Sequence, residues 1–186
     1  MMSDAPNQPA SPLKQRTIAL VGLMGAGKTT VGRRVAARIG LPFFDADAEI
    51  EAAAGMSVTD IFKTHGEGEF RDGERRVISR LLEGPPHVLA TGGGAFMQDE
   101  TRALLKAKAV TVWLKADLDL ITARATKRNT RPLLAEGNPK EIMKRLMDER
   151  YPVYAEADVT VESLEGPHAA AVDAVLDAIT THLEAQ

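Results

Sequence analysis

Hydrophobic positions along the chain alternate between short continuous runs and longer segments in which they recur every three or four residues. The short runs predict five β-strands, at residues 17–22, 42–45, 87–91, 109–114 and 158–161. The longer segments predict helices at residues 28–39, 47–54, 58–65, 68–82, 99–106, 118–127, 140–150 and 169–183. Strands that alternate with helices are typical of an α/β protein with a parallel sheet. No internal repeat and no second hydrophobic core is visible.

Two polar segments interrupt this pattern. Residues 1–16 are rich in proline and contain no apolar run, so they predict a flexible N-terminal tail and not a secretory signal. Residues 127–140 combine charge with proline and glycine, which predicts a mobile loop that could act as a lid. The rest of the pattern, residues 17–186, predicts a single domain with a substantial core.

Composition narrows the function classes. The hydrophobic fraction of 44% and charged fraction of 26% are ordinary for a globular protein, and a net charge of -3 disfavours a general nucleic-acid or membrane surface. The absence of cysteine excludes disulfides, thiolate metal sites and cysteine nucleophiles. No apolar stretch approaches the roughly 18 residues of a membrane span. We therefore expect a cytoplasmic protein without a nucleic-acid or membrane partner.

Directly after the first predicted strand, residues 22–30 read GLMGAGKTT, which fits the pattern G-x-x-x-x-G-K-[ST]. Glycines let successive backbone N–H groups approach phosphate oxygens, because no Cβ stands in the way. Lys28 can then reach the β- and γ-phosphates, Thr29 can bind Mg²⁺, and the following helix adds its N-terminal dipole. The stretch predicts a phosphate-binding loop. A plain glycine turn is disfavoured by the motif and by its place between strand and helix.

The class of nucleotide-binding protein follows from what else the chain contains. A GTPase should show Asn-Lys-x-Asp and D-x-x-G motifs, and neither occurs. Motor and transporter ATPases usually place an acidic residue after a later strand, whereas here the strand at 87–91 runs into three glycines, Gly92 to Gly94. Small-molecule kinases are the remaining large class.

Candidate acceptor residues lie at the predicted ends of strands and helices. Asp45 and Asp47 follow the second strand, where Asp47 could align an acceptor hydroxyl or take its proton, although either aspartate could instead cap a helix. Arg71 could be a surface ion pair with Glu67 or Glu74. Arg150 precedes Pro152, which we expect to stop the helix, so Arg150 could simply be a favourable charge at a helix end. Taken alone, these residues leave their roles open.

Six motifs in register are more specific than any one of them. In order they read GLMGAGKTT, FFDADAEIE, GEGEFRDGE, VLATGGGAF, RNTRPLL and ERYPVYAEAD. Together they resemble the shikimate kinases, and the resemblance extends from about residue 17 to residue 183. It implies a three-layer α/β/α P-loop kinase fold, similar to nucleoside monophosphate kinases, with a five-stranded parallel sheet and a mobile lid. It also implies a monomer that transfers the γ-phosphoryl of ATP to the 3-hydroxyl of shikimate.

The resemblance also implies roles on the nucleotide side. The residues that would wrap the ATP phosphates are Gly25, Ala26, Gly27, Lys28, Thr29 and Thr30. Thr29 would bind Mg²⁺ directly and Asp45 would lie near its water shell. Arg124 would lie near the adenine, and Arg131 of the lid would close on the phosphates, where Arg131 and Lys28 would stabilise the transferred group.

On the acceptor side, the resemblance implies that Asp47 binds the shikimate hydroxyls and is the candidate catalytic base. Arg71 and Arg150 would hold the carboxylate, and Gly93 would offer its backbone N–H to the same ligand. Paired guanidiniums suit a carboxylate and one aspartate suits a diol, so the chemistry agrees. Glu74 would then orient Arg71.

The chain departs from the family at two places. Gly73 is a poor helix former where relatives usually have a larger residue, so we expect a more mobile helix there. Glu165 stands where some relatives have an arginine, so no ATP contact is assigned to residues 163–167. Two other functions stay open: a kinase for another polyol acid such as gluconate, which should differ at Asp47, Arg71 and Arg150, and a nucleotide-binding module without catalysis.

Overall fold

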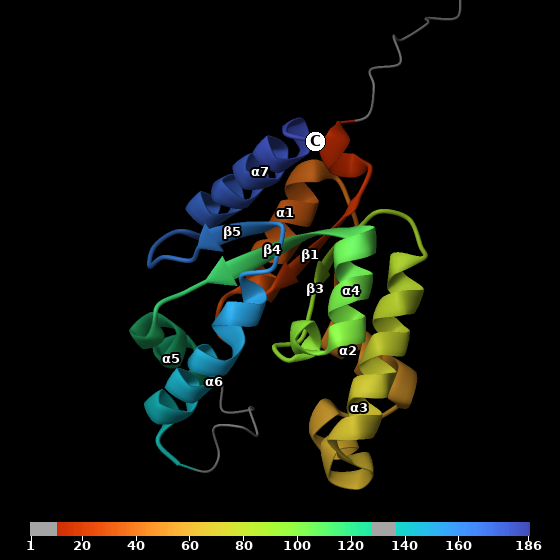
Figure 1. Ribbon diagram of the computed structural model, residues 1–186, viewed down its shortest axis with the longest axis vertical. Coiled ribbons are helices and arrows are strands. Elements are labelled where there is room, and N and C mark those ends of the chain that lie inside the picture. Colours follow the sequence, from red (N-terminus) through yellow and green to blue (C-terminus); the bar gives the residue numbers. More distant parts are fainter. Residues whose placement is uncertain (1–10, 128–136) are drawn as a thin grey trace, which may run out of the picture.

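A five-stranded parallel sheet in the order β2-β3-β1-β4-β5 lies at the centre of the computed structural model, which describes residues 11–127 and 137–186 (Figure 1). Its strands are β1 (Thr17–Val21), β2 (Phe43–Asp45), β3 (Val88–Ala90), β4 (Ala109–Lys115) and β5 (Val159–Glu162). The α-helices are α1 (Lys28–Ile39), α2 (Ala46–Ala54), α3 (Val58–Leu82), α4 (Asp99–Lys108), α5 (Leu118–Thr126), α6 (Pro139–Tyr154) and α7 (His168–Glu184). Two short 3₁₀ helices, η1 (Pro12–Lys14) and η2 (Ala95–Met97), complete the described elements.

The continuous apolar runs form strands because the sheet is covered on both faces. Every residue of β1 and β3 is buried, as are the first six residues of β4. In the register of the sheet, Leu20 of β1 pairs with Ala90 of β3 and with Val112 of β4. Helices α1 and α7 contact one another, and α4 contacts α3 and β4 (Figure 1). Parallel sheets require such cover, and the predicted α/β/α fold with five parallel strands is confirmed.

Two differences from the predicted helices go beyond one or two residues at an end. Helix α6 does not stop after Arg150 but continues through Pro152 to Tyr154. Proline lacks the N–H donor and its ring crowds the carbonyl four residues earlier, yet the next turn still closes through a 3.0 Å bond from Ala155 N–H to the Tyr151 carbonyl. The two helices predicted at 58–65 and 68–82 form α3, with a non-helical residue, Gly66, between them.

The structure also corrects the expectation of a single hydrophobic core. The main core surrounds the sheet and contains Trp113, which is buried as a packing residue. A second, smaller cluster lies between α2 and α3 and contains four buried residues: Ile50, Ile61, Phe70 and Val77. Its members come from two helices, so it shows only when those helices meet in the folded chain.

Some predicted features lie partly or wholly outside the described residues. Residues 1–10 of the predicted tail and residues 128–136 of the predicted lid, with Arg131, are among them. Within the described part of the predicted tail, η1 contacts α7 and Leu13 packs against the main core. None of the helices that the structure describes is long and apolar enough to cross a membrane.

Candidate active site

The loop between β1 and α1 has a backbone that only glycine accommodates at one key position. Gly25 has φ 83°, and a Cβ there would lie 2.9 Å from the Ile121 carbonyl oxygen. The Lys28 ammonium is buried and donates to the carbonyls of Gly22 and Leu23, at 2.7 and 3.0 Å. These bonds hold the cation at the start of α1, beside the loop's own backbone. The loop therefore has the form that phosphate binding requires.

A pocket of about 330 Å³ opens over this loop. Its lining residues are Gly25, Gly27, Lys28, Thr29, Thr30, Asp45, Asp47, Thr91, Gly92, Gly93, Arg124, Lys127 and His168. The structure thus brings most of the predicted nucleotide residues together with Asp47 and Gly93. Ala26, also a residue of this loop, is fully buried and is not among the described residues that line the pocket.

The sequence left open whether Asp45 and Asp47 cap a helix or face an acceptor, and their positions in the structure differ. Asp45 is the N-cap of α2, because one carboxylate oxygen accepts from Ala48 N–H at 3.1 Å. Its other oxygen accepts from the Thr29 hydroxyl at 2.8 Å, which joins β2 to the phosphate-binding loop. Asp47 lies in the first turn of α2 and lines the pocket. Helix capping therefore accounts for Asp45 and leaves the Asp47 side chain directed at the pocket.

Three successive glycines after β3 each lie against a different polar side chain. A Cβ at Gly92 would lie 2.9 Å from Asp47 Oδ1, one at Gly93 would lie 3.3 Å from Arg150 Nη1, and one at Gly94 would lie 2.7 Å from Arg71 Cζ. The three side chains come from α2, α6 and α3. The missing side chains of this loop let one carboxylate and two guanidiniums converge on it. Arg71 and Arg150 approach the loop but are not among the described residues that line the pocket.

Arg71 is fixed by a buried carboxylate on its own helix. Its Nη1 donates to Glu74 Oε1 at 2.9 Å, and Glu74 is fully buried. Burial raises the pKa of Glu74 above its usual range, against the opposing effect of the Arg71 cation. Glu67, the other predicted partner, is exposed and lies 3.6 Å from Arg71 Nε. The predicted orientation of Arg71 by Glu74 agrees with this geometry.

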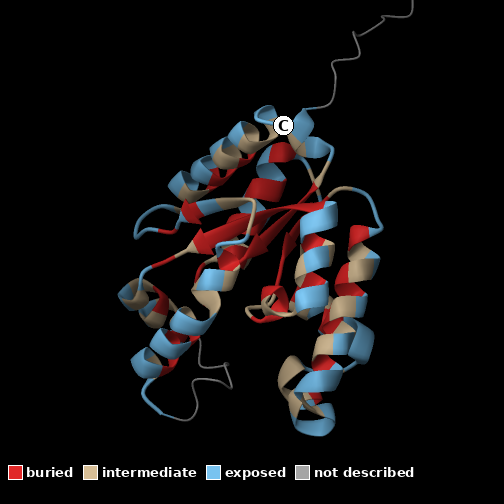
Figure 2. Cartoon of the chain, in the orientation of Figure 1, coloured by how far each residue is buried: buried red, intermediate tan, exposed pale blue. Residues whose placement is uncertain are grey.

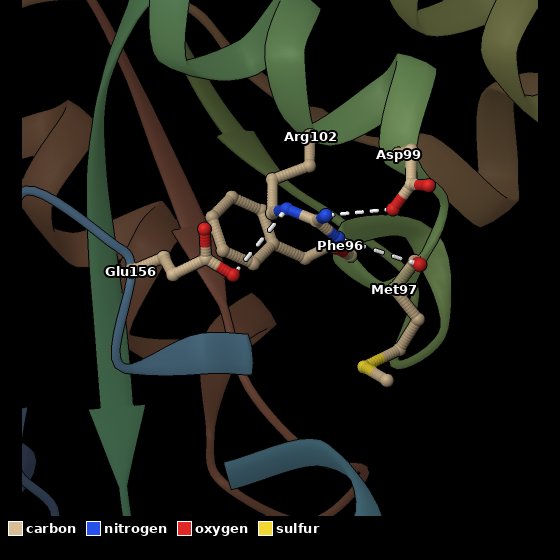
Figure 3. A network of polar contacts seen from close by, with 5 residues as sticks. All are labelled: Phe96, Met97, Asp99, Arg102 and Glu156. Carbon is tan, nitrogen blue, oxygen red and sulfur yellow. Dashed lines mark hydrogen bonds and ion pairs between the residues drawn. The ribbon is translucent and has the colours of Figure 1, made fainter. Parts of the chain in front are cut away.

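Arg102 of α4 binds the chain that follows Gly94, as Figure 3 shows. It donates to the carbonyls of Phe96 and Met97, at 2.9 and 3.4 Å. It also forms ion pairs with Asp99 at 2.7 Å and with Glu156 at 3.6 Å. The network joins η2 to α4 and to the chain just after α6.

On the nucleotide side, Arg124 is held by the segment that was assigned no ATP contact. Arg124 donates to the Ser163 hydroxyl at 2.9 Å and to the Leu164 carbonyl at 3.1 Å. The buried Ser163 hydroxyl donates in turn to the Ala26 carbonyl of the phosphate-binding loop at 3.1 Å. Ser163 therefore connects this segment to both α5 and the loop, although Glu165 itself enters none of these bonds.

The sequence analysis assigned no role to three of the residues that line the pocket, namely Thr91, Lys127 and His168. Thr91 donates its hydroxyl to the Leu20 carbonyl at 2.8 Å, so it ties the end of β3 to β1. His168 opens α7, far from the loop in sequence. Only the glycine run beside Thr91 was a signal that this strand end approaches another group closely.

A parallel sheet with a phosphate-binding loop after its first strand, and with acidic and basic side chains at the same edge, defines a P-loop kinase. The family described as shikimate kinase has a sequence model that matches residues 24–180. A shikimate kinase from Bradyrhizobium diazoefficiens is 57% identical over 173 residues, covering 93% of this chain and 84% of that protein. The chain belongs to the shikimate kinase family.

Solved structures agree with this assignment. Shikimate kinase from Acinetobacter baumannii, in complex with shikimate, has a TM-score of 0.87 and 38% identity, covering 93% of this chain and 98% of that one. A gluconokinase from Sinorhizobium meliloti 1021 has a TM-score of 0.61 at 18% identity, covering 93% of this chain and 99% of that one. The second likeness shows the fold alone.

Proposed function

We propose that this enzyme transfers the γ-phosphoryl group of ATP to the 3-hydroxyl of shikimate, which yields shikimate 3-phosphate and ADP. The observation that carries the proposal is the convergence of Asp47, Arg150 and Arg71 on Gly92, Gly93 and Gly94, beside the phosphate-binding loop. A carboxylate and two guanidiniums match a small acceptor that has a carboxylate and neighbouring hydroxyls.

The nucleotide side supplies phosphate binding and charge. The loop from Gly25 to Thr30 would hold the phosphates, with Lys28 on the β- and γ-groups and Arg124 at the adenine end of the pocket. Arg131, which the family resemblance places on the phosphates, lies outside the described residues and stays a prediction.

The residues present also fit a Mg²⁺ ion. Thr29 would hold it directly and Asp45, 2.8 Å from the Thr29 hydroxyl, would hold it through water. The described residues contain no group of three or more histidines, aspartates or glutamates that could hold a metal ion. This suits Mg²⁺, which is bound through one or two protein groups together with phosphates and waters. When bound, the ion would neutralise charge on the transferred phosphates.

The chemical step is an in-line displacement. The acceptor hydroxyl oxygen bonds to the γ-phosphorus as the bond from that phosphorus to the β,γ-bridging oxygen breaks, and the bridging oxygen leaves with ADP. Asp47 accepts the hydrogen bond of the acceptor hydroxyl and takes its proton. Lys28 stabilises the negative charge of the transferred group.

A coupled ADP-release assay with shikimate, gluconate and AMP tests the proposal. We expect turnover on shikimate alone, and a loss of about 10²–10⁴-fold in kcat for Asp47→Asn. Asp72→Asn, which removes an exposed carboxylate from α3, is the control and should keep wild-type turnover. Preferred turnover of gluconate, or no turnover of shikimate by a protein that binds ATP, would contradict the proposal. Retained turnover in Asp47→Asn would limit Asp47 to positioning.

We further infer that the enzyme is a cytoplasmic monomer that acts without a nucleic-acid or membrane partner. Its mild net charge of -3 supports this inference. Light scattering on the purified chain measures the oligomeric state, and a dimer at assay concentrations would contradict the inferred monomer.

A further inference from the structure

Tyr154, the last residue of α6, reaches from the main core to the acceptor side. Its side chain is fully buried and packs against Phe96 and Trp113, with ring centroids 6.5 and 5.9 Å apart. The Tyr154 hydroxyl donates to the Gly93 carbonyl, 61 residues earlier in the chain. The buried ring of Tyr154 thus places one hydroxyl against the loop of Gly92, Gly93 and Gly94, called here the glycine loop.

The same helix presents Arg150 to the same glycine. Arg150 and Tyr154 are four residues apart, so their side chains share a face of α6. A Cβ at Gly93 would lie 3.3 Å from Arg150 Nη1. Burial raises the pKa of Tyr154 to about 12, with the Arg150 cation opposing the shift. The hydroxyl therefore stays protonated, and remains a donor, throughout the physiological pH range.

The peptide after Gly93 is held differently from its neighbours. The Gly92 and Gly94 carbonyls accept local bonds from Ala95 N–H and Met97 N–H, both at 3.2 Å. The Arg102 network holds the chain that follows, at η2 (Figure 3). The Gly93 carbonyl is instead held from α6, the helix that carries Arg150. The orientation of the Gly93 peptide and the place of Arg150 are therefore coupled.

We propose that Tyr154 is a positioning residue of the acceptor site. By holding the Gly93 carbonyl it fixes the glycine loop against the Arg150 guanidinium, so that the Gly93 N–H and Arg150 meet the acceptor together. The inference rests on the proposed function and extends it to a residue that does not touch the acceptor. Without the hydroxyl, the Gly93 carbonyl loses a buried donor and the glycine loop can turn away from Arg150.

Tyr151 provides a matched control on the same helix. Its hydroxyl also donates to a backbone carbonyl, that of Ala116, at 2.5 Å. Its ring also packs against Trp113, with centroids 4.9 Å apart. Ala116 lies between β4 and α5, away from the glycine loop. A tyrosine that served only to stabilise the fold would behave alike at both positions.

Steady-state kinetics of Tyr154→Phe and Tyr151→Phe, with shikimate and ATP varied separately, test the proposal. Tyr154→Phe removes a buried hydrogen bond to Gly93, which lies beside the Arg150 cation. The KM for shikimate should therefore rise by about 5- to 30-fold. The KM for ATP should stay within about twofold, because the Tyr154 hydroxyl bonds to Gly93 on the acceptor side. Tyr151→Phe should leave the KM for shikimate within about twofold of wild type.

Equal shikimate KM values in the two variants, or equal changes in both KM values of Tyr154→Phe, would overturn the inference and leave the proposed function standing. A wild-type enzyme inactive on shikimate would overturn both. If Tyr154→Phe unfolds at the assay temperature, the rise in Tm that each ligand causes tests the inference instead, because it is measured from below that temperature. A smaller rise in Tm with shikimate than in wild type, beside an undiminished rise with ADP, supports the inference; undiminished rises with both overturn it.

Discussion

The nucleotide side and the part of the acceptor side on α2 and α3 are supported by different amounts of buried structure. The phosphate-binding loop lies between β1 and α1, inside the main core, and Leu23 and Ala26 are fully buried. Helix α2 and the first half of α3 rest on the smaller cluster around Ile61 and Phe70. Figure 2 shows buried residues concentrated at the sheet, whereas α2 and the adjoining turns of α3 are mostly exposed or intermediate.

The glycines on the two sides differ in the same way. The missing Cβ of Gly25 faces backbone atoms of α5, which are fixed by the helix. The missing Cβ of Gly94 faces the guanidinium of Arg71, the end of a flexible side chain. At these two positions, the phosphate-binding loop packs against backbone that cannot adjust, and the glycine loop of the acceptor side packs against a side chain that can. Acceptor specificity can therefore change by replacing side chains while the nucleotide site stays intact.

Among substitutions of the glycines after β3, the largest effect on the KM for shikimate is expected from Gly94→Ala. Gly94 has φ -98°, so alanine fits the backbone, but its Cβ would stand 2.7 Å from Arg71 Cζ. The guanidinium must leave Glu74, which breaks a buried charged hydrogen bond. We expect the KM for shikimate to rise about 10- to 100-fold, the range for a charge-assisted bond. The KM for ATP should change little, whereas the Tm should fall, because Glu74 is left buried without its cation.

Gly25→Ala is the matched substitution on the nucleotide side. Its Cβ would meet the Ile121 carbonyl at 2.9 Å and the Ala125 N–H nitrogen at 3.1 Å, and φ 83° is strained for alanine. The chain should lose about 1–3 kcal/mol of stability together with ATP binding. If Gly94→Ala weakens ATP binding as much as Gly25→Ala does, the distinction between backbone and side-chain construction is wrong.

A smaller effect is expected from Glu74→Gln, and it depends on pH. Because burial raises the pKa of Glu74, the folded chain keeps this proton to a higher pH than the unfolded chain does. The ionised carboxylate therefore lowers stability once the pH rises through the folded pKa, and the loss is recovered as the pH falls. The unfolding free energy of wild type minus that of Glu74→Gln should be larger at about pH 5 than at about pH 8.

Chemical denaturation at several pH values measures this difference. Glu67→Gln removes the exposed carboxylate near Arg71 and is the control, with an expected change within about 0.5 kcal/mol. Glu74→Gln should also weaken shikimate binding, because Arg71 loses its anionic partner. A difference between wild type and Glu74→Gln that stays constant across the pH range would show that Glu74 is not strained by its burial.

The phosphate-binding loop is the part of the site that one local motif predicts, and its nucleotide contacts stay predictions. Its residues are contiguous from Gly22 to Thr30 and form one local motif between a strand and a helix. Asp47, Arg71 and Arg150 come from three helices, and only the family resemblance related them, because their convergence depends on tertiary packing. Their roles stay predictions, although the structure places them around one loop.

Contacts between distant segments could not be predicted from one sequence. Tyr154 and Gly93 are 61 residues apart, and Ser163 and Ala26 are 137 apart. The continuation of α6 past Pro152 has the same origin, since packing of Tyr151 and Tyr154 on Trp113 outweighs the helix-ending tendency of proline. The five strands were predicted because their apolar runs are local signals, and their ends differ by only one residue.

The smallest effect is expected from Gly73→Ala, which tests whether α3 is weakly stabilised near Arg71. This glycine lies in the same turn of α3 as Arg71 and Glu74, and a Cβ there would meet no atom within 4 Å. Gly73→Ala should therefore raise the free energy of unfolding by about 0.5–1 kcal/mol, through helix propensity alone, with little change in KM. Gly66→Ala is the control on the same helix: φ 84° at the kink strains alanine, so stability should fall. If Gly73→Ala raises stability and also slows turnover, a flexible α3 is part of acceptor binding.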